Sequence, residues 1–443
     1  MKTPIIDFVR SYSQSGTSRF HMPGHKGESF LGFEKYDITE IDGADVLSHA
    51  NGIINQSEEN ASSLFSSAHT FYVTQGSTTA ICAMLALVKK SEPQRTVVLA
   101  TRNVHKAFVN ACALLDIDVR WLVSEKTSGI LECKVGAEDV ETELKKLDKK
   151  PDAVYLTSPD YLGNMQDVCG ISKVCRKHGV TLIVDNAHGA YLKFLEKSQH
   201  PIDLGADLCC DSAHKTLPVL TGGAYLHISK TAPAEFVKNA RGKIGLFSST
   251  SPSYLILQSL DLCNAYLADG YREKLSACID EAESVKQLML EKEFAVMDGE
   301  PLKIVIDAKK SGCCTESLAK LMRKNRIEPE FFDDDYMVLM VTPNNTKEDF
   351  ERLEKVFSSE VERIKKPVEE YSIAHPQKRM TIRQAVLSEW ELVDVRMAEG
   401  RICAELTVSC PPAVPIAVSG EVITRDMICL FEKYGITEIK VVK

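Results

Sequence analysis

The sequence has no long apolar run and no excess of basic residues. A membrane-spanning helix needs about 20 consecutive apolar residues, and the longest apolar run here, within residues 80–88, is far shorter. Lysine and arginine number 53 against 62 aspartates and glutamates, which gives a formal net charge of −9 with both signs interspersed. We therefore expect neither a membrane nor a nucleic acid among the partners of this protein.

A secretory leader and a zinc-binding pattern are also missing. Asp7 and Arg10 interrupt the first 16 residues, where a leader would have an unbroken apolar core. The 14 cysteines include no Cys-x-x-Cys with a second matching pair, which a structural zinc site would need. Buried, reduced thiols are the better interpretation for a chain of 443 residues. We predict a cytoplasmic protein without a metal site.

Short β-branched apolar runs alternate with helical patterns between residues 60 and 265. The expected strands are residues 96–100, 119–123, 153–157, 181–184, 206–210 and 224–228, and the expected helices between them include 80–90, 106–115 and 171–178. This alternation predicts an α/β fold with a mostly parallel sheet. The strands are apolar throughout because helices cover both faces of such a sheet.

The rest of the chain predicts smaller units. Residues 302–307, 316–324, 337–341 and 347–361 read as strand, helix, strand and helix, and the polar stretch 365–378 is typical of a linker. We predict four parts: an N-terminal segment at 1–60, a large α/β domain at 61–290, a small α+β domain at 291–365 and a C-terminal α+β domain at 366–443.

Two strand ends carry the most specific chemistry. Asp185 ends the expected strand 181–184, and Lys215 follows the strand 206–210. The carboxyl ends of parallel strands open on one edge of the sheet, where ligands bind. An enzyme that uses pyridoxal 5′-phosphate (PLP) needs this pair, because a lysine forms a Schiff base with the cofactor and a carboxylate keeps its ring nitrogen protonated. Either residue alone is more often an ordinary loop residue, but the ordered pair favours PLP.

Two further segments fit the same cofactor. Residues 74–79, Thr-Gln-Gly-Ser-Thr-Thr, open an apolar helix, and a helix N-terminus with hydroxyl groups binds phosphate. An ordinary Ser/Thr cap explains this segment about as well when it is taken alone. His105, in the loop after strand 96–100, is placed to stack on the pyridine ring or to transfer a proton. A surface histidine is the more common reading of that position by itself.

His21 and His25 are four residues apart, as metal ligands on a helix can be. Pro23 and Gly24 stand between them and prevent that helix. A tight basic turn near an active site is the better interpretation of residues 21–27.

Taken in order, the motifs resemble the Orn/Lys/Arg decarboxylase family, in its short form without the N-terminal wing domain. The matching segments span most of the chain: Phe20-His-Met-Pro-Gly-His-Lys-Gly27, Asp37-Ile-Thr-Glu-Ile-Asp-Gly43, Gln75-Gly-Ser-Thr78, Asn103-Val-His-Lys106, Asp185-Asn-Ala-His-Gly189, Ser212-Ala-His-Lys215, Thr250-Ser-Pro-Ser-Tyr254, Gly400-Arg-Ile402, Pro411-Pro412 and Gly420-Glu-Val-Ile423. The resemblance implies a PLP-dependent, fold-type I large domain.

The resemblance also implies a role for each matching residue. Lys215 would hold PLP, Asp185 would face the ring nitrogen, His105 would stack on the ring, and His188 would lie near the ring and the incoming substrate. The implied phosphate ligands are Ser77, Thr78, Ser212, His214 and, from the neighbouring subunit, Ser249. A homodimer or higher homo-oligomer with shared active sites follows from the position of Ser249.

The implied reaction is decarboxylation of lysine, arginine or ornithine to the amine and CO2, as in polyamine metabolism. An aminotransferase, a carbon–sulfur lyase and a non-catalytic PLP-binding homologue remain alternatives on the same fold. A substrate with a distal positive charge needs a carboxylate partner. Asp45, Asp160 and Glu421 are candidates among which the sequence does not choose.

Three positions depart from the family pattern. Asn186 stands where the family usually has glutamate, Asp160 where it has threonine, and Val46 where it has a second aspartate. These changes leave the cofactor residues intact and bear on the substrate pocket.

Overall fold

The computed structural model describes residues 1–91, 95–122, 134–361, 363, 377–410 and 414–443. Its largest sheet has seven strands in the order β1-β7-β6-β5-β4-β2-β3. The strands are β1 His69–Val73, β2 Val97–Thr101, β3 Asp118–Leu122, β4 Ala153–Thr157, β5 Thr181–Asp185, β6 Leu208–Asp211 and β7 Ala224–Ile228. In this sheet β7 runs antiparallel to β6 and β1, and the other paired strands are parallel. The predicted α/β fold with a mostly parallel sheet is confirmed.

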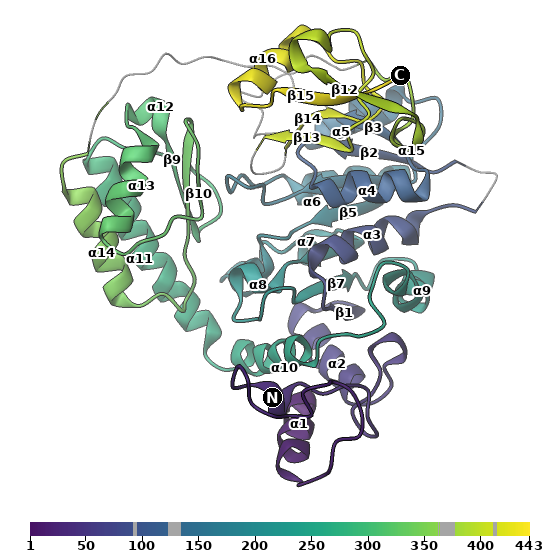
Figure 1. Ribbon diagram of the computed structural model, residues 1–443, viewed down its shortest axis with the longest axis vertical. Coiled ribbons are helices and arrows are strands. Elements are labelled where there is room, and N and C mark those ends of the chain that lie inside the picture. The colour runs from purple at the N-terminus through teal and green to yellow at the C-terminus, as the bar shows by residue number, and fades with distance from the viewer. Residues whose placement is uncertain (92–94, 123–133, 362, 364–376, 411–413) are drawn as a thin grey trace.

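Helices cover both faces of this sheet (Figure 1). Tyr155 of β4 packs in the core shared with α3 (Gly76–Val88), α4 (Lys106–Leu115) and α9 (Ala234–Gly245). Its neighbours Val154 and Leu156 pack in a second core. That core is shared with α5 (Ala137–Lys146) and α6 (Val168–His178). Successive side chains point to opposite faces of a strand, so both faces need apolar residues.

The strand β1 is absent from the sequence prediction. It pairs in antiparallel register with β7, from His69 opposite Ile228 to Val73 opposite Ala224. This partner lies about 150 residues away in the chain, and β1 begins with the polar residues His69 and Thr70, so it lacks the continuous apolar run by which the other strands were predicted.

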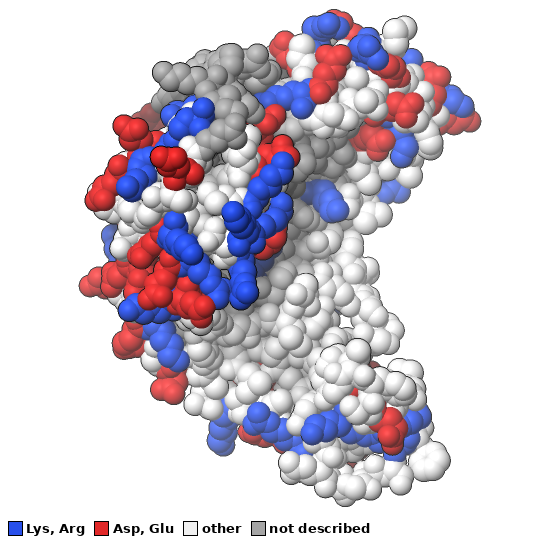
Figure 2. Space-filling view, turned by 60° about the vertical axis from the view of Figure 1, so that its left-hand side comes forward, with Lys and Arg blue, Asp and Glu red and all other residues white. Residues whose placement is uncertain are grey.

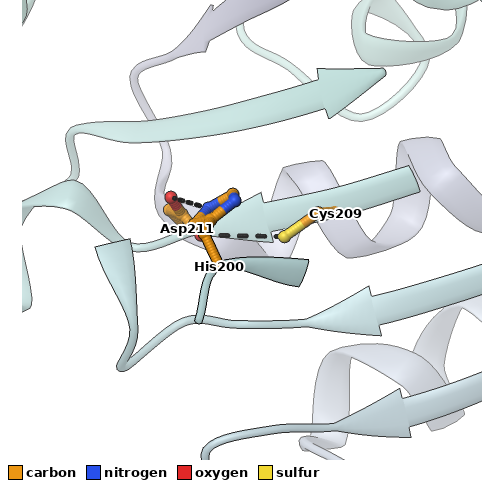
Figure 3. Close-up of side chains that lie close together, drawn as sticks. All are labelled: His200, Cys209 and Asp211. Carbon is orange, nitrogen blue, oxygen red and sulfur yellow. Dashed lines mark hydrogen bonds and ion pairs between the residues drawn. The ribbon is translucent and has the colours of Figure 1, made fainter. Parts of the chain in front are cut away.

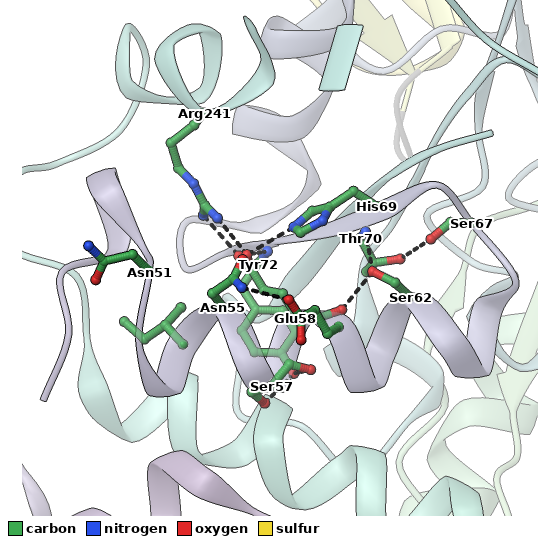
Figure 4. Close-up of polar contacts among 12 residues, drawn as sticks. Asn51, Asn55, Ser57, Glu58, Ser62, Ser67, His69, Thr70, Tyr72 and Arg241 are labelled. Carbon is green, nitrogen blue, oxygen red and sulfur yellow. Dashed lines mark hydrogen bonds and ion pairs between the residues drawn. The ribbon is translucent and has the colours of Figure 1, made fainter. Parts of the chain in front are cut away.

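A buried carboxylate fastens β1 to the helices beside it (Figure 4). Glu58 of α2 (Ile53–Phe65) accepts hydrogen bonds from Arg241 at 2.9 and 2.5 Å, from His69 Nε2 at 3.1 Å and from the backbone N–H of Tyr72 at 2.9 Å. Burial raises the pKa of Glu58, but the bonds from His69 and Arg241 outweigh it and hold that pKa below its ordinary value. A charged Glu58 therefore joins α2, β1 and α9.

Two smaller units complete the described chain. The remaining helices that precede these units in the chain are α1 Pro4–Gln14, α7 Pro201–Leu204, α8 Ala213–Thr216, α10 Tyr254–Ala268 and α11 Tyr271–Glu291. The first unit contains β8 Ala295–Val296, β9 Lys303–Asp307, α12 Ala308–Ser311, α13 Thr315–Lys324, β10 Phe331–Phe332, β11 Tyr336–Met340 and α14 Lys347–Ser358. The second contains α15 Ile382–Leu387, β12 Trp390–Asp394, β13 Thr407–Cys410, β14 Val414–Val418, α16 Arg425–Lys433 and β15 Glu438–Val442. Figure 1 places the first beside the large sheet and the second against its β3 end.

Parts of three predictions fall outside the described residues, among them residue 123 at the end of the expected strand 119–123. Most of the expected linker at 365–378 does so, and so do the prolines of the motif Pro411-Pro412. The division of the chain at residues 60, 290 and 365 stays a prediction. In the described ranges, no helix is both long and apolar enough to cross a membrane.

Candidate active site

The sheet brings Asp185 and Lys215 to one edge. Asp185 is the last residue of β5 and is opposite Cys210 of the parallel strand β6, and Lys215 lies in α8 directly after β6. Lys215 Nζ is 2.9 Å from His188 Nε2. The structure thus groups three predicted site residues at the carboxyl ends of neighbouring parallel strands, where α/β sheets bind ligands.

The surroundings of Lys215 lower the pKa of its amine. Burial lowers the pKa of Lys215, while the negative charges of Asp185 and Glu330 oppose that shift without cancelling it. An amine with a lowered pKa is a better nucleophile toward a carbonyl group. Lys215 is therefore suited to covalent attachment of an aldehyde such as PLP.

Asp185 is held as a buried acceptor. Its Oδ1 accepts from the backbone N–H of Ala187 at 3.1 Å, and its Oδ2 accepts from the hydroxyl of Tyr155 at 3.3 Å. Burial raises the pKa of Tyr155 far above its ordinary value, so the phenol stays protonated and keeps donating. These two donors fix the orientation of the carboxylate.

Two histidines flank this pair. Burial, followed by the charges of Lys303 and Lys215, holds the pKa of His188 well below its ordinary value, so its ring is neutral. His105 is the N-cap of α4, and its Nδ1 accepts from the backbone N–H of Ala107 at 3.1 Å. Burial also lowers the pKa of His105, with Asp185 acting in the opposite direction.

The start of α3 forms a polar cup beside α8. Its N-cap, Gln75, makes no side-chain capping bond, so the first N–H groups of α3 lack that partner. Ser212 Oγ donates to Ser77 Oγ at 2.8 Å, which joins the two segments. Gly222 lies against this turn, where an added Cβ would be 3.1 Å from the carbonyl oxygen of Thr74 and its φ of +99° favours glycine. An open helix N-terminus with hydroxyls fits a phosphate.

Three other residues were predicted to bind the phosphate: Thr78, His214 and Ser249. Thr78 is exposed at the start of α3, and His214 Nδ1 is 2.9 Å from the carbonyl oxygen of Gly223. Ser249 is exposed and its Oγ accepts from the backbone N–H of Ser251 at 3.1 Å, within its own loop. The amine, the carboxylate, the helix N-terminus and the hydroxyls together match the functional groups of PLP.

The three candidate carboxylates for the substrate all have partners within the chain. Asp45 accepts from four backbone N–H groups, at residues 46, 51, 52 and 54. Asp160 accepts from the backbone and side chain of Asn164 at 2.9 and 3.0 Å. Glu421 pairs with Arg102 through both of its oxygens. Structural bonds therefore account for these acids.

The structure adds residues that the sequence reasoning missed. Lys303 and Glu330 belong to the smaller unit that contains β9 and β10, and both are among the charges that act on the Lys215–His188 pair. Each is a single charge in an ordinary stretch of sequence, so no motif marks it.

His21 and His25 bond within the N-terminal segment. The Nε2 of His21 is 2.6 Å from the hydroxyl of Tyr12, and the Nε2 of His25 is 3.3 Å from Asp37. Residues 24–27 form a turn, as predicted, and its position near an active site stays a prediction.

A buried polar cluster lies at the end of β6 (Figure 3). Asp211, at the end of β6, accepts from His200 Nε2 and His227 Nε2 at 3.0 Å each and from Asn186 Nδ2 at 2.6 Å. His200, Cys209 and Asp211 place possible metal-ligand atoms within 4.8 Å of one another. Hydrogen bonds already satisfy the carboxylate, so the cluster is complete as it stands. Asn186 thus acts as a donor to a buried acid.

Two family models match this chain. The model of the Orn/Lys/Arg decarboxylase major domain matches residues 3–309, and that of the C-terminal domain of the same family matches residues 362–434. The chain belongs to the Orn/Lys/Arg decarboxylase family. This membership confirms the family and the class of enzyme, a decarboxylase, that the motifs indicated, and it implies PLP as the cofactor.

Individual relatives agree with this family. An uncharacterized protein of Bacillus subtilis, YaaO, is 30% identical over 97% of this chain and 93% of its own length. An arginine decarboxylase of Halalkalibacterium halodurans is 28% identical over 96% of this chain and 92% of its own length. The crystal structure of the lysine decarboxylase LdcF of Francisella novicida has a TM-score of 0.82 at 18% identity, covering 100% of this chain and 81% of that one. That last likeness shows a shared fold.

Proposed function

We propose that this family member decarboxylates a basic amino acid, lysine, arginine or ornithine, to the corresponding amine and CO2, with PLP bound to Lys215. The observation that carries the proposal is the position of Lys215 Nζ, 2.9 Å from His188 at the sheet edge where Asp185 ends β5. The arginine decarboxylase relative supports a basic substrate.

Each residue of the site has a defined task in this reaction. PLP, when bound, supplies a protonated ring that accepts electrons as the carbon–carbon bond breaks. Asp185 would keep the ring nitrogen protonated, and His105 would stack on the ring. His188, neutral and beside Lys215, exchanges a proton with the reacting atoms. Ser77, Thr78, Ser212 and His214 would hold the phosphate together with the first N–H groups of α3.

Glu330 is our proposed partner for the distal charge of the substrate. It is exposed, its Oε1 accepts from the hydroxyl of Tyr161 at 3.0 Å, and its charge acts on Lys215. Tyr161 in turn meets the ring of His188 edge-on, with centroids 5.5 Å apart. A carboxylate at this position is free to accept from an ammonium or guanidinium.

The enzyme is proposed to act as a cytoplasmic homodimer or higher homo-oligomer, with Ser249 reaching the phosphate of the neighbouring subunit. Ser249 is exposed in one chain, as such a role requires. Phe20, Phe30 and Leu31 are 97%, 79% and 76% exposed, which is typical of residues that an interface covers. Figure 2 shows a hollowed face that is almost free of charged side chains, between charged regions.

The deciding experiment is a panel of amino acids assayed for CO2 and amine with added PLP. We expect CO2 from at least one of lysine, arginine and ornithine and none from Lys215→Ala. Faster turnover of aspartate or a neutral amino acid than of all three would refute the basic substrate. A keto-acid product or released sulfide would instead identify an aminotransferase or a carbon–sulfur lyase, and no turnover a non-catalytic homologue.

Glu330→Gln tests the recognition of the distal charge. Loss of a charge-assisted hydrogen bond, worth about 1.5–3 kcal/mol, should raise KM for the basic substrate roughly 10- to 100-fold. The matched control is Glu328→Gln, because Glu328 is also exposed but pairs with Arg323 at 2.7 Å. Equal effects of the two variants would rule out Glu330.

A further inference from the structure

A second lysine reaches His188 from the other side. Lys303, at the start of β9, is 3% exposed, and its Nζ lies 3.4 Å from His188 Nδ1. The same Nζ is 3.2 Å from the carbonyl oxygen of Asp160 and 3.9 Å from Glu300 Oε1. His188 therefore stands between two lysines, with Nδ1 toward Lys303 and Nε2 toward Lys215.

The contacts of Lys303 fit the protonated form. An ammonium group has three N–H donors and no acceptor, and the carbonyl oxygen of Asp160 and the carboxylate of Glu300 beside Lys303 Nζ can only accept. Glu300 is buried, which raises its pKa, while the charge of Lys303 and the hydrogen bonds from the Tyr191 hydroxyl and the Leu302 backbone N–H act in favour of its carboxylate form. Burial lowers the pKa of Lys303, while Glu300 and Asp160 oppose this shift.

We propose that Lys303 is a positioning residue that fixes His188 as the tautomer with its proton on Nε2. Because the ammonium donates to Nδ1, that nitrogen keeps its lone pair and the ring proton must be on Nε2. Nε2 then donates to Lys215 Nζ, which accepts only as a neutral amine. Lys303 thereby holds both the proton of His188 and the lone pair of Lys215 in the state that attachment of an aldehyde requires.

Charged side chains from several elements act on His188 and Lys215. His105 and His214 join Lys303 in disfavouring a charged His188, and Lys215 does so too whenever it is protonated. The negative charges of Asp185 and Glu330 raise the pKa of Lys215 and so oppose the effect of its burial. Lys303 comes from the smaller unit, whereas His188 follows β5 of the large sheet, so the state of His188 depends on how these two parts meet.

The test is the ¹⁵N spectrum of ring-labelled histidine in the cofactor-free protein, with His188→Gln used to assign the His188 signals. We expect a protonated Nε2 and an unprotonated Nδ1 near neutral pH. In Lys303→Met, signal should shift toward a protonated Nδ1, and the pKa of His188 should rise because a neighbouring cation is gone. The control is Lys193→Met, which removes a lysine that is also buried but pairs with Asp203.

Activity gives a second measurement, which depends on the proposed function. With PLP and substrate, kcat of Lys303→Met should fall about 10- to 100-fold, as when a hydrogen-bond partner that orients a metal-ligating histidine is lost, with KM little changed. A wild-type ring protonated on Nδ1 would overturn the inference even if Lys303→Met does not fold. An unchanged tautomer in that variant, or the same change in Lys193→Met, would overturn it too. Absence of turnover in the wild type would refute the decarboxylase alone, since the spectrum needs no substrate.

Discussion

Glu421 should hold the C-terminal unit against the large sheet. Both of its oxygens accept from the guanidinium of Arg102, which follows β2, and Arg102 also donates to the carbonyl oxygens of Pro415 and Ile416 at 3.2 Å each. Arg102 and Glu421 are 7% and 2% exposed. A buried ion pair of this kind is costly to break, because the remaining charge has no partner.

The informative change is Glu421→Gln, which keeps the shape and removes the charge. Breaking a buried pair by removing one partner costs about 3–5 kcal/mol. Every 1.4 kcal/mol is a factor of ten in an equilibrium constant. Opening of the C-terminal unit should therefore become roughly 100- to 4,000-fold more frequent, provided that the unit opens locally.

Cys403 reports this opening. Its backbone N–H donates to the carbonyl oxygen of Glu421 at 2.8 Å, and its side chain is fully buried, which raises the pKa of the thiol. The assay is the rate of Cys403 alkylation, followed by mass spectrometry, with the exposed Cys429 as the internal standard. We expect faster alkylation of Cys403 in Glu421→Gln and an unchanged rate at Cys429.

An exposed ion pair in the same unit provides the control. Glu391 accepts from Arg401 at 2.6 Å, and both side chains are more than a third exposed, so Glu391→Gln should cost at most about 1 kcal/mol. Unchanged protection of Cys403 in Glu421→Gln, or an equal loss in Glu391→Gln, would refute the reasoning.

Three further outcomes are expected. Asp185→Asn should keep PLP bound to Lys215, seen by absorbance, but lower kcat roughly 10- to 100-fold, since a contact of about 1.5–3 kcal/mol to the ring proton is lost; near-normal kcat would exclude this role. Burial raises the pKa of Asp261 from 3.8 to about 6, so its folded form binds a proton that the unfolded chain releases, and its contribution to stability is present below about pH 4 and lost as pH rises through 6. The unfolding temperature of Asp261→Asn, minus that of the wild type, should therefore grow between pH 4 and 6, and a constant difference would contradict the shift. Mixing Lys215→Ala chains with Ser249→Trp chains under subunit exchange should restore part of the activity, because one site of each heterodimer then carries neither change; no recovery would disprove shared sites.

Much of the fold and of the candidate site was predictable because it is encoded locally. The strands β4 and β7 and the helix α4 have the residue ranges that their apolar patterns predict. The pair Asp185 and Lys215 could be placed on one edge because parallel strands share the direction of their carboxyl ends. The order of the motifs along the chain then indicated the family, which the family models confirm.

The partners of the charged side chains were decided by the tertiary structure. Asp45, Asp160 and Glu421 are equivalent loop acids in the sequence, yet folding gives them backbone N–H groups, Asn164 and Arg102 as partners. Hydrogen bonds and ion pairs act only over a few ångströms, and Arg102 is 319 residues from Glu421 in the chain. The sequence by itself determined that Asp185 and Lys215 follow neighbouring parallel strands and so meet at one edge of the sheet, whereas only the folded chain brought Lys303 and Glu330 close to them.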